Sequence, residues 1–243
     1  MHSDDVPIGR LLTRREALAL LGASGAALFG GAFLTSAATG ALPGCVVRPA
    51  QTEGPFFVDG ELDRSDIRYD ARGGNARQGT PLKLKFNVAR IGGESCAPLA
   101  GAQVHVWHSD ASGRYSDTDV RQASATSLQF LRGYQLTDAA GAAQFLTIVP
   151  GWYAGRTAHI HFKIRLVAAP GSTGRSQEFT SQLYFDDALQ DRLFAAAPYG
   201  PRGRRDTRNA DDFLYRNGGK HLLLDLQPDG LGYATVFDIG VQV

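Results

Sequence analysis

The segment 159–166, H-I-H-F-K-I-R-L, constrains the fold more than any other part of the chain. Its polar and apolar residues alternate strictly, which is the period of a β-strand whose two faces differ. His159 and His161 therefore project side by side from one face, close enough for both imidazoles to bind one metal ion. Tyr153 and Arg156 lie just upstream. This short stretch predicts both a strand and a candidate active site.

An H-x-H pair alone is a weak signal, because histidine is common on the solvent-facing side of antiparallel strands. The surroundings of this pair favour a metal. Tyrosines flank it, whereas no cysteine lies near enough in sequence to complete a zinc set, and no carboxylate to complete a two-histidine-one-carboxylate iron site. A phenolate is a hard oxygen ligand, which suits ferric iron better than zinc.

Short apolar or alternating segments, separated by turns rich in Gly, Pro and Asp, recur from residue 82 onward. Only residues 187–196 have a helical pattern of any length, beginning at an aspartate cap region. Many short strands with almost no helix predict an all-β protein, a two-sheet β-sandwich with short helical segments and long loops. The predicted strands cover residues 82–88, 104–106, 130–137, 144–149, 159–166, 179–185, 221–226 and 233–241.

Length and charge limit the number of domains and the kinds of partner that we expect. A chain of 243 residues with 43% hydrophobic content can bury one sizeable core, and a β-rich domain of this size need not be split. The formal net charge is +1, and both signs are mixed along the chain apart from the basic run Arg202, Arg204, Arg205 and Arg208. We expect no nucleic-acid partner, although the basic run could border the access route of an anionic substrate.

The first 38 residues have the pattern of an export signal. Arg14 and Arg15 precede an apolar, Gly/Ala-rich run at 18–34, and small residues at 36–41 offer a cleavage site. The run is too short and too weakly apolar for a membrane span, which needs about 20 strongly apolar residues. A twin-arginine signal at residues 1–38 fits best, although Ala17 stands where a bulkier apolar residue is usual. We predict a mature catalytic domain at residues 39–243, without a stable membrane span, in the periplasm or outside the cell.

The chain has two cysteines, Cys45 and Cys96. An even number in an oxidising compartment favours a disulfide, which would tie the mature N-terminus to the sandwich. The alternative is lipidation of Cys45 in the sequence L-P-G-C. Pro43 is unfavourable there, and lipidation would leave Cys96 as a free thiol.

Several motifs together resemble the intradiol ring-cleavage dioxygenases, non-haem ferric enzymes that open catechols between the two hydroxylated carbons with O2 and give muconate-type diacids. The resemblance runs from about Cys45 to the C-terminus, and it is strongest to the exported single-domain branch related to the protocatechuate and catechol enzymes. The motifs are Q-T-E-G-P-F-F at 51–57, G-A-Q-V-H-V-W-H-S-D-A-S-G-R-Y-S at 101–116, R-G-Y-Q-L-T-D at 132–138, P-G-W-Y at 150–153, G-R-T-A-H-I-H-F at 155–162 and F-T-S-Q-L-Y-F-D-D at 179–187.

The resemblance implies an Fe(III) cofactor and a role for each matching residue. Tyr153 is implied to leave the iron and accept a substrate proton, while Tyr115 stays bound. Arg156 is implied to stabilise the anionic ring carbon that forms as oxygen attacks. The implied iron ligands are Tyr115, Tyr153, His159 and His161; Arg156 and Gln182 are implied to lie beside the substrate, and Thr52, Gly54 and Phe56 to line the pocket.

Two departures from the family pattern leave questions open. Tyr153 and His159 are six residues apart, a shorter interval than in the cytoplasmic members, so we expect a more open pocket rim and the cleavage of several substituted catechols. There is also no room between the signal and Cys45 for the helical dimer domain of the cytoplasmic catechol enzymes, so the chain could be a monomer or a homodimer.

Two other classes stay open at this point. One is a β-sandwich that binds phenols or sugars without turnover. The other is a zinc or copper hydrolase that uses the two histidines with a carboxylate. We interpret His105 and His108 as structural histidines.

Overall fold

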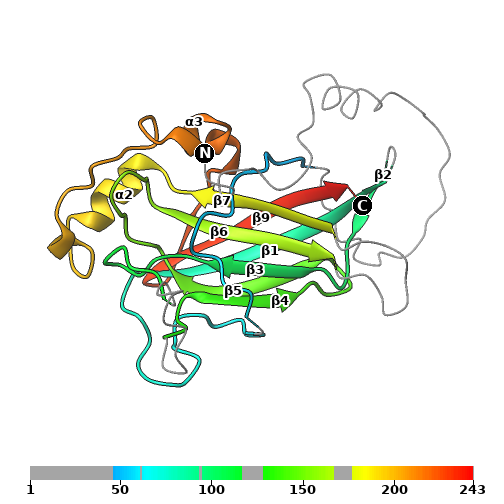
Figure 1. Ribbon diagram of the computed structural model, residues 1–243, viewed down its shortest axis with the longest axis horizontal. Helices are drawn as coiled ribbons and strands as arrows, with labels where there is room; N and C mark the ends of the chain where they lie inside the picture. Colours follow the sequence, from blue (N-terminus) through cyan, green and yellow to red (C-terminus); the bar gives the residue numbers. More distant parts are fainter. Residues whose placement is uncertain (1–45, 61, 93–94, 117–127, 167–176, 243) are drawn as a thin grey trace, which may run out of the picture.

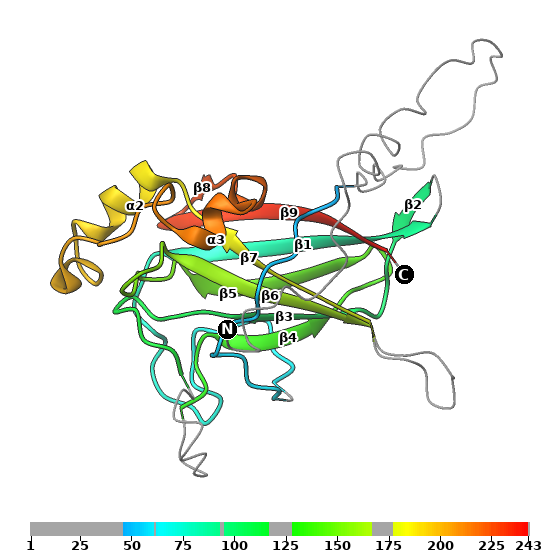
Figure 2. The ribbon, with the colours of Figure 1, turned by 45° about the horizontal axis from the view of Figure 1, so that its top comes forward.

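A computed structural model describes residues 46–60, 62–92, 95–116, 128–166 and 177–242. Within them, nine strands form two layered sheets, and short helices lie at one end of the strands (Figures 1 and 2). The strands are β1 (Pro81–Gly92), β2 (Ser95–Pro98), β3 (Gln103–Trp107), β4 (Arg132–Leu136), β5 (Ala142–Ile148), β6 (His159–Leu166), β7 (Gln177–Tyr184), β8 (Gln227–Asp229) and β9 (Gly232–Gln242). The helical segments are α2 (Asp187–Phe194), η3 (Gly200–Arg202), α3 (Phe213–Arg216) and η4 (Gly219–Leu222).

The two sheets differ in their strand pairing. The β1 sheet has the order β2-β1-β9-β8, with β5 also paired to β1. Its central pair, β1 and β9, is parallel, with Leu82 opposite Tyr233, and its other pairs are antiparallel. The β6 sheet has the order β4-β3-β6-β7 and is antiparallel throughout. The predicted all-β, two-sheet sandwich is confirmed.

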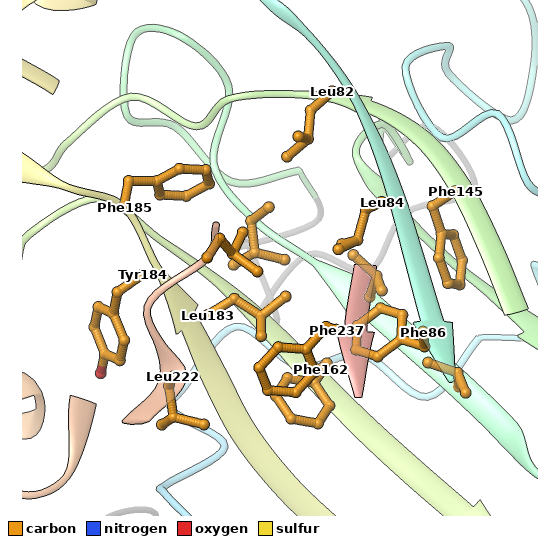
Figure 3. Packing of buried hydrophobic residues seen from close by; sticks show 14 of the residues in the cluster. Leu82, Leu84, Phe86, Phe145, Phe162, Leu183, Tyr184, Phe185, Leu222 and Phe237 are labelled. Atoms are coloured by element: carbon orange, nitrogen blue, oxygen red, sulfur yellow. The ribbon is translucent and has the colours of Figure 1, made fainter. Parts of the chain in front are cut away.

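The core lies between the sheets and depends on the alternation of apolar residues along the strands. Phe86 of β1 is fully buried, and its ring lies 6.2 Å from the ring of Phe145, 5.3 Å from that of Phe162 and 5.8 Å from that of Phe237. Figure 3 shows these rings gathered at the centre of the cluster. Because they come from β1, β5, β6 and β9, this contact joins both sheets.

We expect Phe86→Ala to lower the free energy of unfolding by about 3 to 5 kcal/mol, because it leaves a cavity where four strands meet. Urea denaturation followed by far-UV circular dichroism measures it. Leu136→Ala is the matched control, since Leu136 is 53% exposed and its truncation should change stability by no more than about 0.5 kcal/mol. Equal effects of the two substitutions would contradict this description of the core.

One predicted strand is wrong. Residues 221–226 were expected to form a strand, but the structure has η4 up to Leu222 and a single bridge from Leu223 to Tyr184. Leu222 and Leu224 are buried and Leu223 is exposed, so the alternation reflects an extended segment packed on the core without a strand ladder. The predicted helix at 187–196 is confirmed as α2, which Asp186 caps by accepting hydrogen bonds from two backbone N–H groups.

The polar face of β6 does not meet solvent. Every residue from His159 to Ile164 is buried. The N-terminal segment 49–57 crosses this face (Figure 1), and it is fixed there by hydrogen bonds from the backbone N–H of Gln51 to Thr180 O, 2.9 Å, and from Gln182 Nε2 to Thr52 O, 3.1 Å. The two histidines therefore project into a covered layer.

The predicted export signal at residues 1–38 and Cys45 lie outside the described residues. The signal, the export route and the Cys45–Cys96 bridge therefore stay predictions. In the part of the chain that the structure describes, no helix is both long and apolar enough to cross a membrane.

Candidate metal centre

Four side chains meet at the start of β6, at the end of the sheet that carries the helices. His159 and His161 belong to β6, Tyr153 lies in the loop before it, and Tyr115 lies in the loop after β3. The Nε2 atom of His159 is 3.1 Å from Nε2 of His161, 3.2 Å from Oη of Tyr153 and 3.4 Å from Oη of Tyr115. The structure thus brings together all four residues predicted to be metal ligands.

The His159 imidazole presents a free electron pair to the centre. His159 Nδ1 is 2.7 Å from the backbone oxygen of Thr157. A carbonyl oxygen can only accept, so Nδ1 carries the hydrogen and the Nε2 of a neutral ring is left with its lone pair. Burial, with Arg156 acting in the same direction, lowers the pKa of both His159 and His161 well below the ordinary value, so both rings are neutral.

The tyrosines are also held neutral by the protein alone. Burial raises the pKa of Tyr115 well above its ordinary value, and it raises that of Tyr153 although Arg156 acts against it. A cation between the four side chains would reverse this, because it favours the phenolate and can accept the lone pairs of both imidazoles. Two hard phenolate oxygens and two imidazole nitrogens fit a ferric ion.

Two further observations bear on the donor set. His161 Nδ1 is buried without a hydrogen-bond partner among the described residues. Over the same residues, no group of three His, Cys, Asp or Glu side chains is arranged to hold a metal ion, so the donors beside the two histidines are the tyrosines.

The two tyrosines are not equivalent. Tyr115 is buried, and its ring stacks on that of Phe56 with the centroids 4.2 Å apart. Tyr153 is partly exposed and contacts Phe56 only edge to face. A small molecule that enters the centre can therefore reach the Tyr153 hydroxyl more readily than the Tyr115 hydroxyl.

Arg156 places a positive charge beside the four donors. Its Nη1 is 3.5 Å from His159 Nε2, and its Nη2 donates to Gln182 Oε1 at 2.6 Å. Burial opposes this charge, but the Asp212 carboxylate, which accepts a hydrogen bond from Nε, favours it, and the pKa of Arg156 is raised. The guanidinium thus stays charged in a poorly solvated site, where it acts most strongly on developing negative charge.

The segment that crosses β6 supplies the three predicted pocket residues. Gly54 lies against His161, where a Cβ atom would be 3.2 Å from His161 Cε1, and its φ of +73° also favours glycine. Phe56 covers Tyr115, and the backbone oxygen of Thr52 holds the Gln182 amide. These residues form the cover of the centre.

Trp107 and Asp212 also contribute to the centre, and sequence reasoning did not find them. The Trp107 ring stacks on His161 with centroids 5.0 Å apart and an interplanar angle of 10°. Asp212 Oδ2 accepts a hydrogen bond from Arg156 Nε at 2.7 Å. The sequence signal for Asp212 is that of a helix cap before F-L-Y-R, which says nothing of a contact 56 residues away.

The structural interpretation of His108 is confirmed. Its Nδ1 donates to Ser109 O at 2.8 Å, and its Nε2 accepts from Thr147 Oγ1 at 2.6 Å, so both nitrogens are satisfied away from the centre. His105 bonds to Gln103 Oε1 through Nε2 at 3.2 Å.

The basic run is largely offset by acidic residues of α2. Arg205 and Arg208 each form ion pairs with Asp187 and Asp191. Arg202 instead lies over the ring of Trp152, the residue before Tyr153, at 4.5 Å from the ring centroid. Of these cations, Arg202 is the one in contact with the loop that carries Tyr153.

Comparison with known proteins finds similarity to dioxygenases. A family model described as Dioxygenase matches residues 52–206. The chain is 30% identical over 162 residues to the protocatechuate 3,4-dioxygenase beta chain of Burkholderia cepacia, covering 62% of this chain and 67% of that protein. It is 31% identical over 158 residues to catechol 1,2-dioxygenase 2 of Acinetobacter lwoffii, covering 57% of this chain and 51% of that protein. The chain thus spans about half the length of this catechol relative.

Two solved structures share the fold over most of the chain. An intradiol ring-cleavage dioxygenase from Tetranychus urticae superposes with a TM-score of 0.66 at 29% identity, covering 82% of this chain and 95% of that one. The dioxygenase domain of a dioxygenase carbohydrate-binding protein fusion from Streptomyces sp. SirexAA-E gives a TM-score of 0.57 at 29% identity, covering 82% and 99%.

Proposed function

Because the chain belongs to the intradiol ring-cleavage dioxygenases, a family of oxidoreductases, we propose that it is a non-haem Fe(III) enzyme that cleaves catechol-type aromatics between the two hydroxylated carbons with O2. The expected products are muconate-type diacids. The observation that carries the proposal is the convergence of two phenol oxygens and two imidazole nitrogens beside a buried guanidinium.

We assign Tyr115, Tyr153, His159 and His161 as the iron ligands. When bound, Fe(III) would hold the catechol oxygens and make the ring electron-rich toward O2. The protein fixes the His159 ring through Thr157 O and keeps Tyr115 under Phe56, so these two ligands have little freedom to move. The more accessible Tyr153 Oη is the group that takes a proton from a substrate hydroxyl.

Arg156 stabilises the negative charge that develops on the substrate, and Gln182 holds Arg156 in place. As oxygen attacks, an aromatic carbon becomes anionic, and a fixed guanidinium in a water-poor site stabilises it without reorganisation. Gln182 holds Arg156 Nη2 on one side and the backbone of Thr52 on the other, which links the cation to the cover of the centre.

The test is metal analysis of the purified protein together with oxygen uptake over a panel of catechol, protocatechuate, hydroxyquinol and chlorinated catechols. We expect a reddish-brown, iron-containing protein that consumes one O2 per ring opened and accepts more than one member of the panel. Catechol binding without oxygen uptake would favour a binding module. A zinc or copper protein without the reddish-brown colour that stays inactive after loading with iron would favour a hydrolase, and either result would overturn the proposal.

A further inference from the structure

Asp212 is a completely buried carboxylate that accepts hydrogen bonds with both oxygens. Its Oδ2 accepts from Arg156 Nε at 2.7 Å and from the backbone N–H of Thr157 at 2.9 Å. Its Oδ1 accepts from the backbone N–H groups of Leu214 at 2.8 Å and Tyr215 at 3.0 Å, at the start of α3. One carboxylate therefore joins α3 to the loop that precedes β6.

We propose that Asp212 is a positioning residue for the proposed ring cleavage, which sets the direction of the Arg156 guanidinium and the register of the loop that carries it. The inference rests on the proposed function. Asp212 itself touches none of the four donor atoms and acts through Arg156 and Thr157.

Two of the three nitrogens of the Arg156 guanidinium have fixed acceptors. Asp212 accepts from Nε at 2.7 Å and Gln182 accepts from Nη2 at 2.6 Å. Nη1 is left to face His159 Nε2 at 3.5 Å. A planar group held at two nitrogens has no freedom to rotate, and its remaining donor is aimed where negative charge develops.

Thr157 links Asp212 to His159. The backbone N–H of Thr157 donates to Asp212, and its backbone oxygen accepts from His159 Nδ1 at 2.7 Å. The Thr157 hydroxyl also donates to Asn209 Oδ1 at 2.7 Å, so this residue is fixed from the same segment as Asp212. The orientation of the His159 ring thus depends on residues that follow α2.

The position of Asp212 in the chain differs from that of the other residues of the centre. The family model matches residues 52–206, which include the four proposed ligands, Arg156 and Gln182. Asp212 lies beyond that match and is fixed as the cap of α3. One of the two side-chain contacts that position the cation is therefore supplied from outside the part of the chain that the family model matches.

The experiment is Asp212→Asn in the full-length, iron-loaded protein. Asparagine carries an NH2 group in place of one carboxylate oxygen. We expect its oxygen to keep the helix-capping contacts with Leu214 and Tyr215, so the NH2 group faces Arg156 Nε, which loses its acceptor. We expect kcat for catechol to fall about 10- to 100-fold, while iron content, resting absorption and KM change little. Asp186→Asn is the matched control, because Asp186 caps α2 in the same way without an arginine contact, and its kcat should stay at the wild-type value.

The Arg156→Ala background separates positioning from general loss of structure. Asp212→Asn should lower kcat much less in that background than in the wild type, because Arg156 is absent and only the contact with Thr157 is left to lose. Losses that multiply would overturn the proposal. If Asp212→Asn alone does not fold, the double variant Arg156→Ala/Asp212→Asn, which removes both buried charges, is used instead. Its kcat is compared with that of Arg156→Ala.

A readout without turnover separates this inference from the proposed function. In the metal-free protein, the Arg156 Nε–H should give a slowly exchanging signal in 15N NMR, because it is hydrogen-bonded to a buried acceptor. In Asp212→Asn this signal should exchange fast. An unchanged signal in the variant would overturn the positioning role even if the wild type cleaves catechol, and an inactive wild type with a protected signal would overturn the proposed function alone.

Discussion

Tyr115→Phe is expected to remove both the colour and the ring-cleaving activity of the protein. Tyr115 is buried beneath Phe56 and is assigned as the phenolate that stays bound throughout, so its loss takes away a permanent ligand and part of the charge that balances Fe(III). Iron content by elemental analysis and the phenolate-to-iron absorption band should both fall, and oxygen uptake with catechol should reach background.

Tyr153→Phe is expected to differ in kind. Tyr153 is the more accessible tyrosine and is assigned as the base for a substrate proton, so iron should remain while kcat falls about 100-fold or more. Tyr134→Phe is the control, because the Tyr134 ring contacts His105 away from the centre, and it should leave iron, colour and kcat unchanged. Equal phenotypes for Tyr115→Phe and Tyr153→Phe would contradict their assignment to different roles.

Arg156→Ala is expected to keep the iron, its colour and the spectral change on anaerobic addition of catechol, while kcat falls about 100- to 1,000-fold. The reason is that the guanidinium acts on charge that develops after the substrate is bound. Arg156→Lys should recover little, because an ammonium cannot contact Asp212, Gln182 and the centre from one planar group. A loss confined to KM would assign Arg156 to substrate binding instead.

The same substitution should also destabilise the fold. Arg156→Ala leaves the Asp212 carboxylate buried without its cation, which costs about 3 to 5 kcal/mol for a pair broken on one side. Arg90→Ala, at an exposed position of β1, removes the same charge and should have no such effect. Urea denaturation of both variants at one pH measures the difference.

The sequence predicts well the features that depend on residues close together along the chain. The alternation along 159–166 places the two histidines on one face because the strand period is local, and the same reasoning locates most of β1, β5, β7 and β9. The family motifs then indicate Tyr115 and Tyr153 as partners of those histidines, and the structure brings all four together.

What the sequence does not predict depends on contacts between distant segments. Alternation cannot tell that the polar face of β6 is covered, because the covering residues, such as Gln51, lie more than 100 positions earlier and bond to the neighbouring strand at Thr180. Asp212 has an ordinary helix-cap pattern, and its second role exists only once α3 lies against the loop at Thr157. The prediction of a strand at 221–226 is wrong because alternate residues can be buried in an extended segment without a strand ladder.

The segment that covers the histidines is attached to β9, which is the described strand farthest from it along the chain. Before it crosses β6, it bridges β9 through Val47 and Gly240, and Arg48 Nε donates to Asp238 O at 3.0 Å. Because β9 is also the parallel partner of β1, the β1 sheet and the cover of the centre both depend on pairing between distant segments, 190 positions apart for Arg48 and Asp238. Pairing of such distant segments is intrinsically slow. We therefore expect the cover of the four donor side chains to form later in folding than local pairing such as that of β6 with β7.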